Sequence, residues 1–477
     1  MNRRILLTAL TLLVFLCACQ ASVEDSPGSS SGEPAEGSAV ELTDPPALEA
    51  VDLMKEEAVQ YYSPDPEDVS RYVLVSAADL DEDCRYWIVD PEDSAHYIEV
   101  TLTQSDKIGE YEYVIYKGPD LTQEELDATL VEVMEDYPAV AVSVAAIEDG
   151  EVTASGAWGW AVKNEREMTA DTKVRVASLS KVSIGMCAMA MAEDGLLALD
   201  APLSDYWGES ARNPYSSTQP SAYTLMTHTS SIASRENQRG LSNLRGLLRT
   251  SWRRMEPGNG GYWSYSNFGF CILGTTLELA ADQVLDDYLQ ARFFEPMGIR
   301  ASLYAGRLEA GEVACLYNAG GGVERSASAQ TTQGVPNTIG QGASYYPGGL
   351  TISAPDLAKL VSILVNDGTY DGVRYLSPES VADMETPRFT VDYLADTYPF
   401  EQCLVLRHQE DLMGRSSVYY HTGSAYGVHS LLSYDPEARD GVVVITVGTP
   451  RRVDERGLYT LCADLSERLY EKMEGEP

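Results

Sequence analysis

Two strand-length segments rich in apolar residues lie near the C-terminus, at residues 428–434 and 441–447. The turn sequence Asp435-Pro436-Glu437 joins them, which predicts adjacent antiparallel strands. Further strands are predicted over 138–176. Although these regions are distant in sequence, we expect the strands of 138–176 and 418–447 to pair in one antiparallel sheet.

Helical segments are predicted on either side of these strands. One lies near 122–136, where Thr122-Gln123-Glu124-Glu125 has the pattern of a capping box, and another near 455–472. Both are expected to cover the sheet. From Ser180 to Gly195 an Ala- and Met-rich run is typical of a buried helix. The fold class predicted is therefore α+β, an antiparallel sheet flanked by helices with an inserted all-α lobe in two interlocked parts.

The first 118 residues divide into three predicted segments. Residues 1–18 have a charged start (Arg3, Arg4) and a short apolar stretch, as in a signal peptide. Residues 19–46 are rich in Ser, Gly, Pro and Glu and predict a disordered tether. Residues 47–118 predict a small α+β module, with a helix over Val51 to Tyr62 and strands at 72–75, 86–89, 97–100 and 111–116. It could bind a wall polymer or only pack on the remainder, 119–477.

The end of the apolar stretch fits a lipoprotein signal. In Leu16-Cys17-Ala18-Cys19, cleavage before Cys19 would leave this cysteine to receive a lipid. The stretch is too short to span a bilayer, which takes about 20 residues. We expect an extracytoplasmic protein with a lipid anchor at Cys19. A plain cleaved secretory signal, giving a secreted or periplasmic protein, remains the alternative.

Ser178 and Lys181 form the first chemical motif, Ser178-Leu179-Ser180-Lys181. Ser178 is expected at a helix N-terminus, with Lys181 one turn later on the same face. A serine hydroxyl is a weak nucleophile until a base takes its proton, and a buried lysine with a lowered pKa can act as that base. Alone, the motif could equally be an N-cap serine followed by a solvated lysine.

The second motif, Tyr265-Ser266-Asn267, lies between a Gly-rich loop and an apolar helix start. Tyr265 and Asn267 are expected to project from the loop into a cleft. A phenol can shuttle a proton, and an amide side chain can hold a substrate carbonyl. Alone, the motif could be a turn with a stacking tyrosine.

The third motif is His421-Thr422-Gly423, followed by Ser424. A glycine in a strand lets another backbone approach closely, so a substrate could pair here like an additional strand. The alternative is a glycine bulge with an incidental histidine.

Together the three motifs resemble those of the serine beta-lactamase and penicillin-binding-protein superfamily. The most similar branch holds class C beta-lactamases, D-alanyl-D-alanine carboxypeptidases and esterases. Three further segments resemble this branch, and the likeness covers about residues 121–475: Leu199-Asp200-Ala201-Pro202-Leu203, Leu225-Met226-Thr227-His228-Thr229-Ser230-Ser231, and Pro347-Gly348-Gly349-Leu350 followed by Ala354-Pro355-Asp356-Leu357. The resemblance implies a beta-lactamase/transpeptidase-like fold.

The resemblance also implies roles for the motif residues. Ser178 would be the acylated nucleophile, Lys181 its proton acceptor or relay, and Tyr265 would share base duty and protonate the leaving group. Asn267 would bind the substrate amide, and His421 and Thr422 would face a substrate carboxylate. The N–H groups of Ser178 and Ser424, beside Gly423, would bind the oxyanion. His228 is expected only to stabilise a turn.

One residue departs from the class C pattern, which usually has lysine where this chain has His421. Several carboxypeptidases and esterases have histidine there. A neutral histidine would hold a substrate carboxylate less firmly. We therefore expect a D-amino-acid peptide or an ester in preference to a beta-lactam. A non-catalytic penicillin-binding-like receptor or wall-binding module is the competing interpretation. An α/β hydrolase is disfavoured because the one Gly-x-Ser-x-Gly match, at residues 28–32, lies in the Ser- and Gly-rich segment and not between a strand and a helix.

Composition narrows the partners further. A formal net charge of −39 disfavours nucleic-acid binding. The substrate is expected to be a small molecule or a peptidoglycan-derived group. The cysteines outside the signal region are scattered, and Cys187 and Cys271 lie in apolar helical runs that predict buried thiols. His and Cys spacing predicts no metal site, and no cofactor is expected.

Overall fold

The computed structural model describes residues 40–41, 60–64, 71–75, 80, 85–89, 97–104, 111–115 and 121–473, except Asn237 and 393–398. The chain divides into an N-terminal unit, Met1–Gly118, and a C-terminal unit, Pro119–Pro477. The predicted signal peptide and Cys19 lie outside the described residues, as does most of the predicted tether.

The N-terminal unit contains a six-stranded sheet in the order β1-β3-β2-β4-β5-β6. Its strands are β1 (Val40–Glu41), β2 (Tyr62–Pro64), β3 (Arg71–Leu74), β4 (Arg85–Val89), β5 (Tyr97–Gln104) and β6 (Tyr111–Ile115). Two predictions need correction. Val40–Glu41, expected in the tether, pairs with Arg71 and Tyr72. Tyr62, expected at the end of a helix, pairs with Leu74 and Trp87.

A nine-stranded antiparallel sheet forms the centre of the C-terminal unit, in the order β16-β17-β18-β19-β20-β21-β7-β8-β9. The strands are β7 (Ala141–Glu148), β8 (Glu151–Val162), β9 (Arg166–Glu167), β16 (Phe389–Val391), β17 (Phe400–Gln402), β18 (Arg407–Leu412), β19 (Arg415–Ala425), β20 (Val428–Asp435) and β21 (Asp440–Val447). Val447 pairs with Ala141, so β21 lies beside β7. This confirms the prediction that strands of 138–176 and 418–447 pair in one antiparallel sheet.

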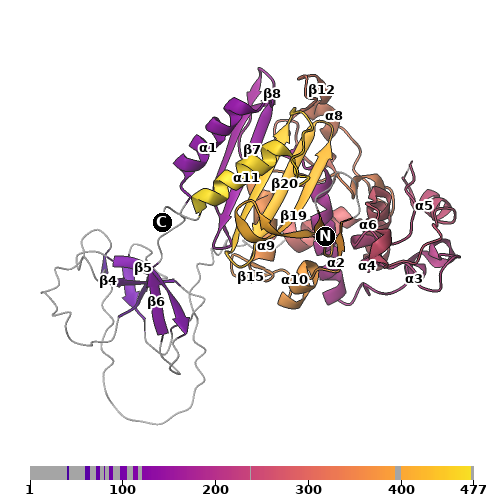
Figure 1. The fold of residues 1–477 in the computed structure, drawn as a ribbon, viewed down its shortest axis with the longest axis horizontal. Coiled ribbons are helices and arrows are strands. Elements are labelled where there is room, and N and C mark those ends of the chain that lie inside the picture. Colours follow the sequence, from indigo (N-terminus) through magenta and orange to yellow (C-terminus); the bar gives the residue numbers. More distant parts are fainter. Residues whose placement is uncertain are drawn as a thin grey trace, which may run out of the picture. The chain divides into compact units, whose positions relative to one another are not determined.

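Helices α1 (Gln123–Asp136) and α11 (Thr460–Met473) cover one face of this sheet (Figure 1). Alternate strand residues such as Val142, Val144 and Val444 pack under them. The capping box predicted at Thr122 and Glu125 is present. Helix α11 begins five residues later than predicted. The Asp454 carboxylate accepts a hydrogen bond from the Leu458 N–H in the loop before it.

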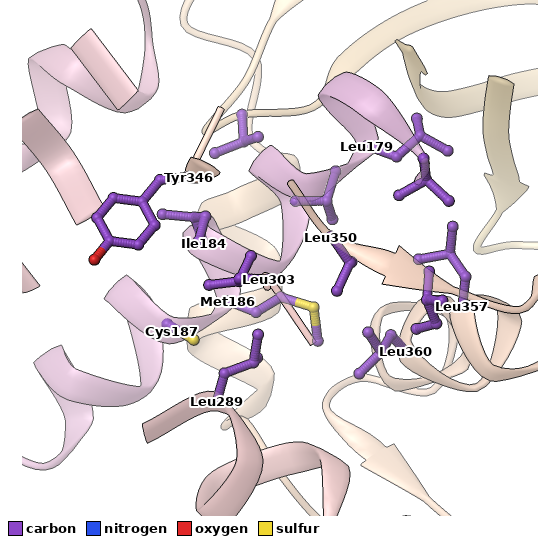
Figure 2. Packing of buried hydrophobic residues seen from close by; sticks show 14 of the residues in the cluster. Leu179, Ile184, Met186, Cys187, Leu289, Leu303, Tyr346, Leu350, Leu357 and Leu360 are labelled. Atoms are coloured by element: carbon purple, nitrogen blue, oxygen red, sulfur yellow. The ribbon is translucent and has the colours of Figure 1, made fainter. Parts of the chain in front are cut away.

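Helix α9 (Ala354–Val365) packs on the other face of the sheet, and α2 (Ser180–Glu193) and α6 (Asn267–Ala281) pack on each other in the same hydrophobic core. Helix α2 is buried on all sides, which agrees with its Ala- and Met-rich sequence. Figure 2 shows Ile184, Met186 and Cys187 of α2 among leucines from several remote segments. This core fixes the start of α2, and therefore the first motif, against the sheet.

Short elements complete the predicted α lobe and its connections. The helices are α3 (Ser204–Trp207), α4 (Ala222–Met226), α5 (Leu241–Leu248), α7 (Leu285–Leu289), α8 (Ala327–Thr331) and α10 (Pro378–Glu385). Three two-stranded pairs are β10 (Val174–Arg175) with β13 (Thr351–Ile352), β11 (Leu316–Tyr317) with β12 (Val323–Arg325), and β14 (Thr369–Tyr370) with β15 (Val373–Arg374). No helix of the described chain could cross a membrane by itself; α6 and Leu285–Phe294 together meet the length and composition criteria, across a 74° bend.

Candidate functional site

Ser178 lies in a single 3-10 turn, Ala177–Leu179, directly before α2. Ala177 has a φ of 52°, a left-handed conformation that costs a non-glycine residue free energy. The Ser180 side chain holds this turn: its hydroxyl donates to the Ala177 carbonyl at 2.6 Å and accepts from the Leu350 N–H at 3.0 Å. The half-buried Ser178 is thus presented on a constrained turn at the start of a buried helix.

Lys181 lies under this serine and is fully buried. Its Nζ is 3.0 Å from the Ser178 Oγ and donates to the Pro347 carbonyl oxygen at 2.7 Å. The Pro347 carbonyl therefore holds the amine toward the serine. This is the geometry that proton transfer between the two groups requires.

Burial lowers the pKa of the Lys181 amine, because a charged ammonium loses its hydration there. The charge of Tyr265 and a side-chain hydrogen bond with it oppose that shift, and Arg407 adds to it. No carboxylate forms an ion pair with Lys181 among the described residues. The lowered pKa makes the neutral amine, which is the form able to accept a proton, easier to reach.

Tyr265 brings the phenol of the second motif to the same place. The Lys181 Nζ lies 4.9 Å from the centre of the Tyr265 ring. Behind it, the His228 ring centre is 4.4 Å from that of Tyr265. The His228 Nδ1 accepts a hydrogen bond from the Ser266 N–H at 3.2 Å. His228 thus supports the loop that carries Tyr265.

Asn267 is the first residue of α6, whereas the sequence suggested a loop position before the helix. Ser266 is the N-cap, since its hydroxyl accepts a hydrogen bond from the Gly269 N–H at 2.9 Å. The Asn267 side chain is exposed, with no hydrogen bond among the described residues. Its predicted role in binding an amide remains a prediction.

The third motif lies on β19, directly beside the serine turn. A β-carbon at Gly423 would lie 2.6 Å from the Val176 carbonyl oxygen and 3.1 Å from the Ser178 nitrogen. Only glycine permits this approach. The Ser430 hydroxyl of β20 donates to the same Val176 carbonyl at 2.9 Å, which joins the sheet to the turn.

Residues 421–425 of β19 pair with β20 on one side. On the other side, pairing with β18 ends at Tyr420. Among the described residues this leaves an unpaired strand edge that an extended substrate could join. Thr422 is half-buried and Ser424 is exposed along it.

His421 is buried and its ring centre lies 6.4 Å from that of Tyr265. Burial, then the charges of Arg407 and Lys181, hold the pKa of His421 well below its ordinary value. The imidazole is therefore neutral near pH 7. Its Nδ1 lies 2.8 Å from the Thr422 carbonyl oxygen, so Nδ1 carries the proton and Nε2 has a free lone pair. In this form Nε2 accepts hydrogen bonds and cannot donate one to a carboxylate.

The structure thus brings Ser178, Lys181, Tyr265, His421 and Gly423 together. Sequence reasoning missed the groups that position them: the Pro347 carbonyl, the hydroxyls of Ser180 and Ser430, and the charge of Arg407. A backbone carbonyl and isolated serines leave no signal in a single sequence. Within the described residues, no group of three or more His, Cys, Asp or Glu side chains could hold a metal ion.

Residues 126–465 match the family model described as Beta-lactamase. Protein Rv1367c of Mycobacterium tuberculosis is 29% identical over 251 residues, in an alignment that covers 47% of this chain and 61% of that protein. The D-aminopeptidase of Brucella anthropi is 28% identical over 37% of this chain and 35% of its own length. Esterase EstB of Burkholderia gladioli is 28% identical over 37% of this chain and 50% of its own. The chain thus matches less than two thirds of each of these relatives.

Among solved structures, the D-alanine carboxypeptidase AmpC of Burkholderia cenocepacia has a similar fold. The TM-score is 0.57 at 18% identity, covering 73% of this chain and 99% of that one. At this identity the likeness supports the fold alone, and it confirms the predicted beta-lactamase/transpeptidase-like architecture.

Proposed function

The chain belongs to the beta-lactamase family, and we propose that it is a serine hydrolase that works through an acyl-enzyme on Ser178. The observation that carries this proposal is the 3.0 Å contact between the Lys181 Nζ and the Ser178 Oγ in a site where burial lowers the pKa of the amine. A receptor without turnover would have no need for this costly buried amine.

In the proposed reaction the Ser178 Oγ attacks the substrate carbonyl carbon while its proton passes to the Lys181 amine. The N–H groups of Ser178 and Ser424 stabilise the oxyanion, each such donor being worth about 3–4 kcal/mol. The C–N or C–O bond then breaks, and the leaving group takes the proton through Tyr265. Water hydrolyses the acyl-enzyme by the reverse route, with Lys181 and Tyr265 taking and returning its proton.

We propose a D-amino-acid peptide or an ester as the substrate, in preference to a beta-lactam. Neutral His421 offers a lone pair at Nε2 where a lysine would offer a charge. Relatives named as a D-aminopeptidase and an esterase support this choice.

Covalent labelling tests the nucleophile. A fluorescent fluorophosphonate or penicillin should label the protein, and Ser178→Ala should abolish the label. Ser183→Ala is the matched control, because Ser183 lies on the same helix and donates to the Ser180 carbonyl. Labelling of Ser178→Ala at the wild-type rate would contradict the proposal. Wild-type protein that takes no label and turns over no ester or peptide would favour a binding protein.

We also propose that the enzyme acts outside the cytoplasm and is held at the membrane by a lipid attached to Cys19. The charged start, apolar stretch and Leu16-Cys17-Ala18-Cys19 sequence support this. Metabolic labelling with a palmitate analogue in a bacterial host should modify the full-length protein but not Cys19→Ala. Cys17→Ala is the control. Unmodified, freely secreted wild-type protein would contradict the anchor.

A further inference from the structure

Three arginines surround two tyrosine rings beside the serine turn. The guanidinium carbons of Arg175 and Arg325 lie 5.0 Å and 4.9 Å from the centre of the Tyr426 ring. Those of Arg175 and Arg239 lie 6.0 Å and 5.9 Å from the centre of the Tyr345 ring. None of the three arginines forms an ion pair among the described residues, although the protein has a net charge of −39.

Arg175 is at the centre of this group, three residues before the nucleophile. Its Nε donates to the Gly348 carbonyl oxygen at 2.6 Å, which fixes the direction of the guanidinium. Burial lowers the pKa of Arg175; Tyr426 and Tyr345 oppose this shift, and the positive charge of Arg325 adds to it. The fold therefore holds like charges close together at a cost. An anion bound between them would relieve that cost.

Tyr426 occupies a position that is unusual for a tyrosine. Ala425 pairs with Val428, so Tyr426 and Gly427 form a two-residue hairpin loop between β19 and β20. Both have positive φ angles, 52° and 73°. Such a loop favours Asn-Gly, and a bulky residue there costs on the order of 1 kcal/mol. The strain keeps an aromatic ring, 39% exposed, within 5.0 Å of the guanidinium carbons of two arginines.

The arginine cluster lies at one end of the unpaired β19 edge that an extended substrate could join. Along β19, His421 and Thr422 come first, Ser424 next and Tyr426 two residues later. A substrate that pairs with this edge and directs its leaving group toward His421 would direct its acyl portion toward Tyr426. This assignment of sides rests on the proposed function.

A cavity of about 530 Å³ adjoins the cluster and shares Arg239 with it. Its other lining residues are Glu236, Gln238 and Ser344, and the Arg239 Nε donates to the Ser344 hydroxyl at 3.3 Å. The cavity has room for a side chain of the acyl portion. Glu236 is the one acidic group among its lining residues, and it is exposed.

We propose that Arg175, Arg239 and Arg325 form a subsite that recognises a carboxylate on the acyl portion of the substrate. Guanidinium groups bind carboxylates through two parallel hydrogen bonds, which gives direction as well as attraction. The enzyme would then select acyl groups that carry a negative charge away from the bond that is cleaved.

A pair of esters with one leaving group tests this subsite. The 4-nitrophenyl monoester of adipic acid carries a terminal carboxylate, whereas 4-nitrophenyl hexanoate has the same acyl length and no charge. Wild-type protein should favour the adipate ester by about tenfold in kcat/KM, and added salt should reduce this preference. Arg325→Gln should lower the ratio of the two values about tenfold. Arg254→Gln, whose guanidinium lies 5.0 Å from the Tyr215 ring, is the matched control and should keep the wild-type ratio.

Three outcomes would overturn the subsite. One is equal kcat/KM for the two esters in the wild-type protein. Another is an unchanged ratio in Arg325→Gln, and a third is an equal fall in Arg254→Gln. In each case Ser178-dependent hydrolysis of the hexanoate ester would leave the proposed function intact. If neither ester is hydrolysed and no probe labels Ser178, the proposed function fails as well.

Discussion

Gly423 lies against the main chain of Ser178, so closely that a β-carbon would be 3.1 Å from the Ser178 nitrogen. Gly423→Ala should therefore push β19 away from the serine turn. We expect a loss of about 1–3 kcal/mol in the free energy of unfolding. The acylation rate should also fall, by tenfold or more, because an oxyanion donor moves. Urea unfolding and stopped-flow acylation would measure the two effects.

Gly246→Ala provides the control for this change. Gly246 lies in α5 and has no atom within 4 Å of its added β-carbon. Alanine favours a helix by about 1 kcal/mol over glycine, so this variant should be as stable as wild type or more so. Equal acylation rates in Gly423→Ala and Gly246→Ala would mean that the close approach has no part in the reaction.

Lys181→Met should separate activity from stability. Loss of the base should lower the acylation rate by about 10²–10⁴-fold. Because the pKa of Lys181 is lowered on folding, the unfolded chain binds more protons between that lowered pKa and the ordinary value. The contribution of Lys181 to stability therefore rises with pH in this window. Methionine cannot titrate, so any stability advantage of Lys181→Met should shrink from pH 7 to pH 10. A gap that is constant with pH would contradict a lowered pKa.

His421→Lys should raise kcat/KM for substrates with a free carboxylate on the leaving group, because a cation would replace a lone pair. The gain is measured as kcat/KM on a D-Ala-D-Ala peptide against its C-terminal amide, with the neutral His421→Gln as control. The new charge would be buried near Lys181 and Arg407, so stability should fall by roughly 1–3 kcal/mol. Identical discrimination by the lysine and glutamine variants would show that a charge at position 421 does not act on the carboxylate of the leaving group.

Glu385, which lies outside the candidate site, makes the free energy of unfolding depend on pH. Burial raises its pKa to about 7, and the Tyr434 hydroxyl donates to its Oε1 at 2.8 Å. Since the folded pKa is raised, the stabilisation is fully present near pH 4.5 and is lost as pH rises through about 7. Glu385→Gln keeps a hydrogen-bond acceptor without titrating.

From pH 4.5 to pH 8 the wild-type protein should lose roughly 3 kcal/mol relative to Glu385→Gln. Denaturant titrations of both proteins at several pH values would measure this. Parallel stability curves would show that Glu385 does not titrate in this range.

The central residues of the site could be identified from the sequence because each lies in a short motif with its own local structure. Ser178 and Lys181 are one helical turn apart, so their proximity follows from α2 itself. The contact between Lys181 and Pro347 depends on tertiary packing and a main-chain oxygen. No residue type encodes it, and only the structure reveals it.

The fold shows a similar division. The central strand β21 has a continuous apolar run, Val442 to Ile445, because helices cover both faces of the sheet, and it was predictable from that pattern. The strand conformation of Tyr62 was not predictable, because its segment has helix-like periodicity. Pairing with Leu74 and Trp87 decides its conformation instead. Local preference is weak where a neighbouring strand supplies hydrogen bonds.

The pairing of Val447 with Ala141 also governs how the C-terminal unit can be made. Strand β7 leaves the ribosome early but gains its neighbour β21 only when almost the whole chain exists. Until then its apolar edge is open to other chains. Such long-range pairing folds slowly. A chain that stops before β21 should therefore aggregate, whereas the full-length chain can close this edge only after synthesis of β21.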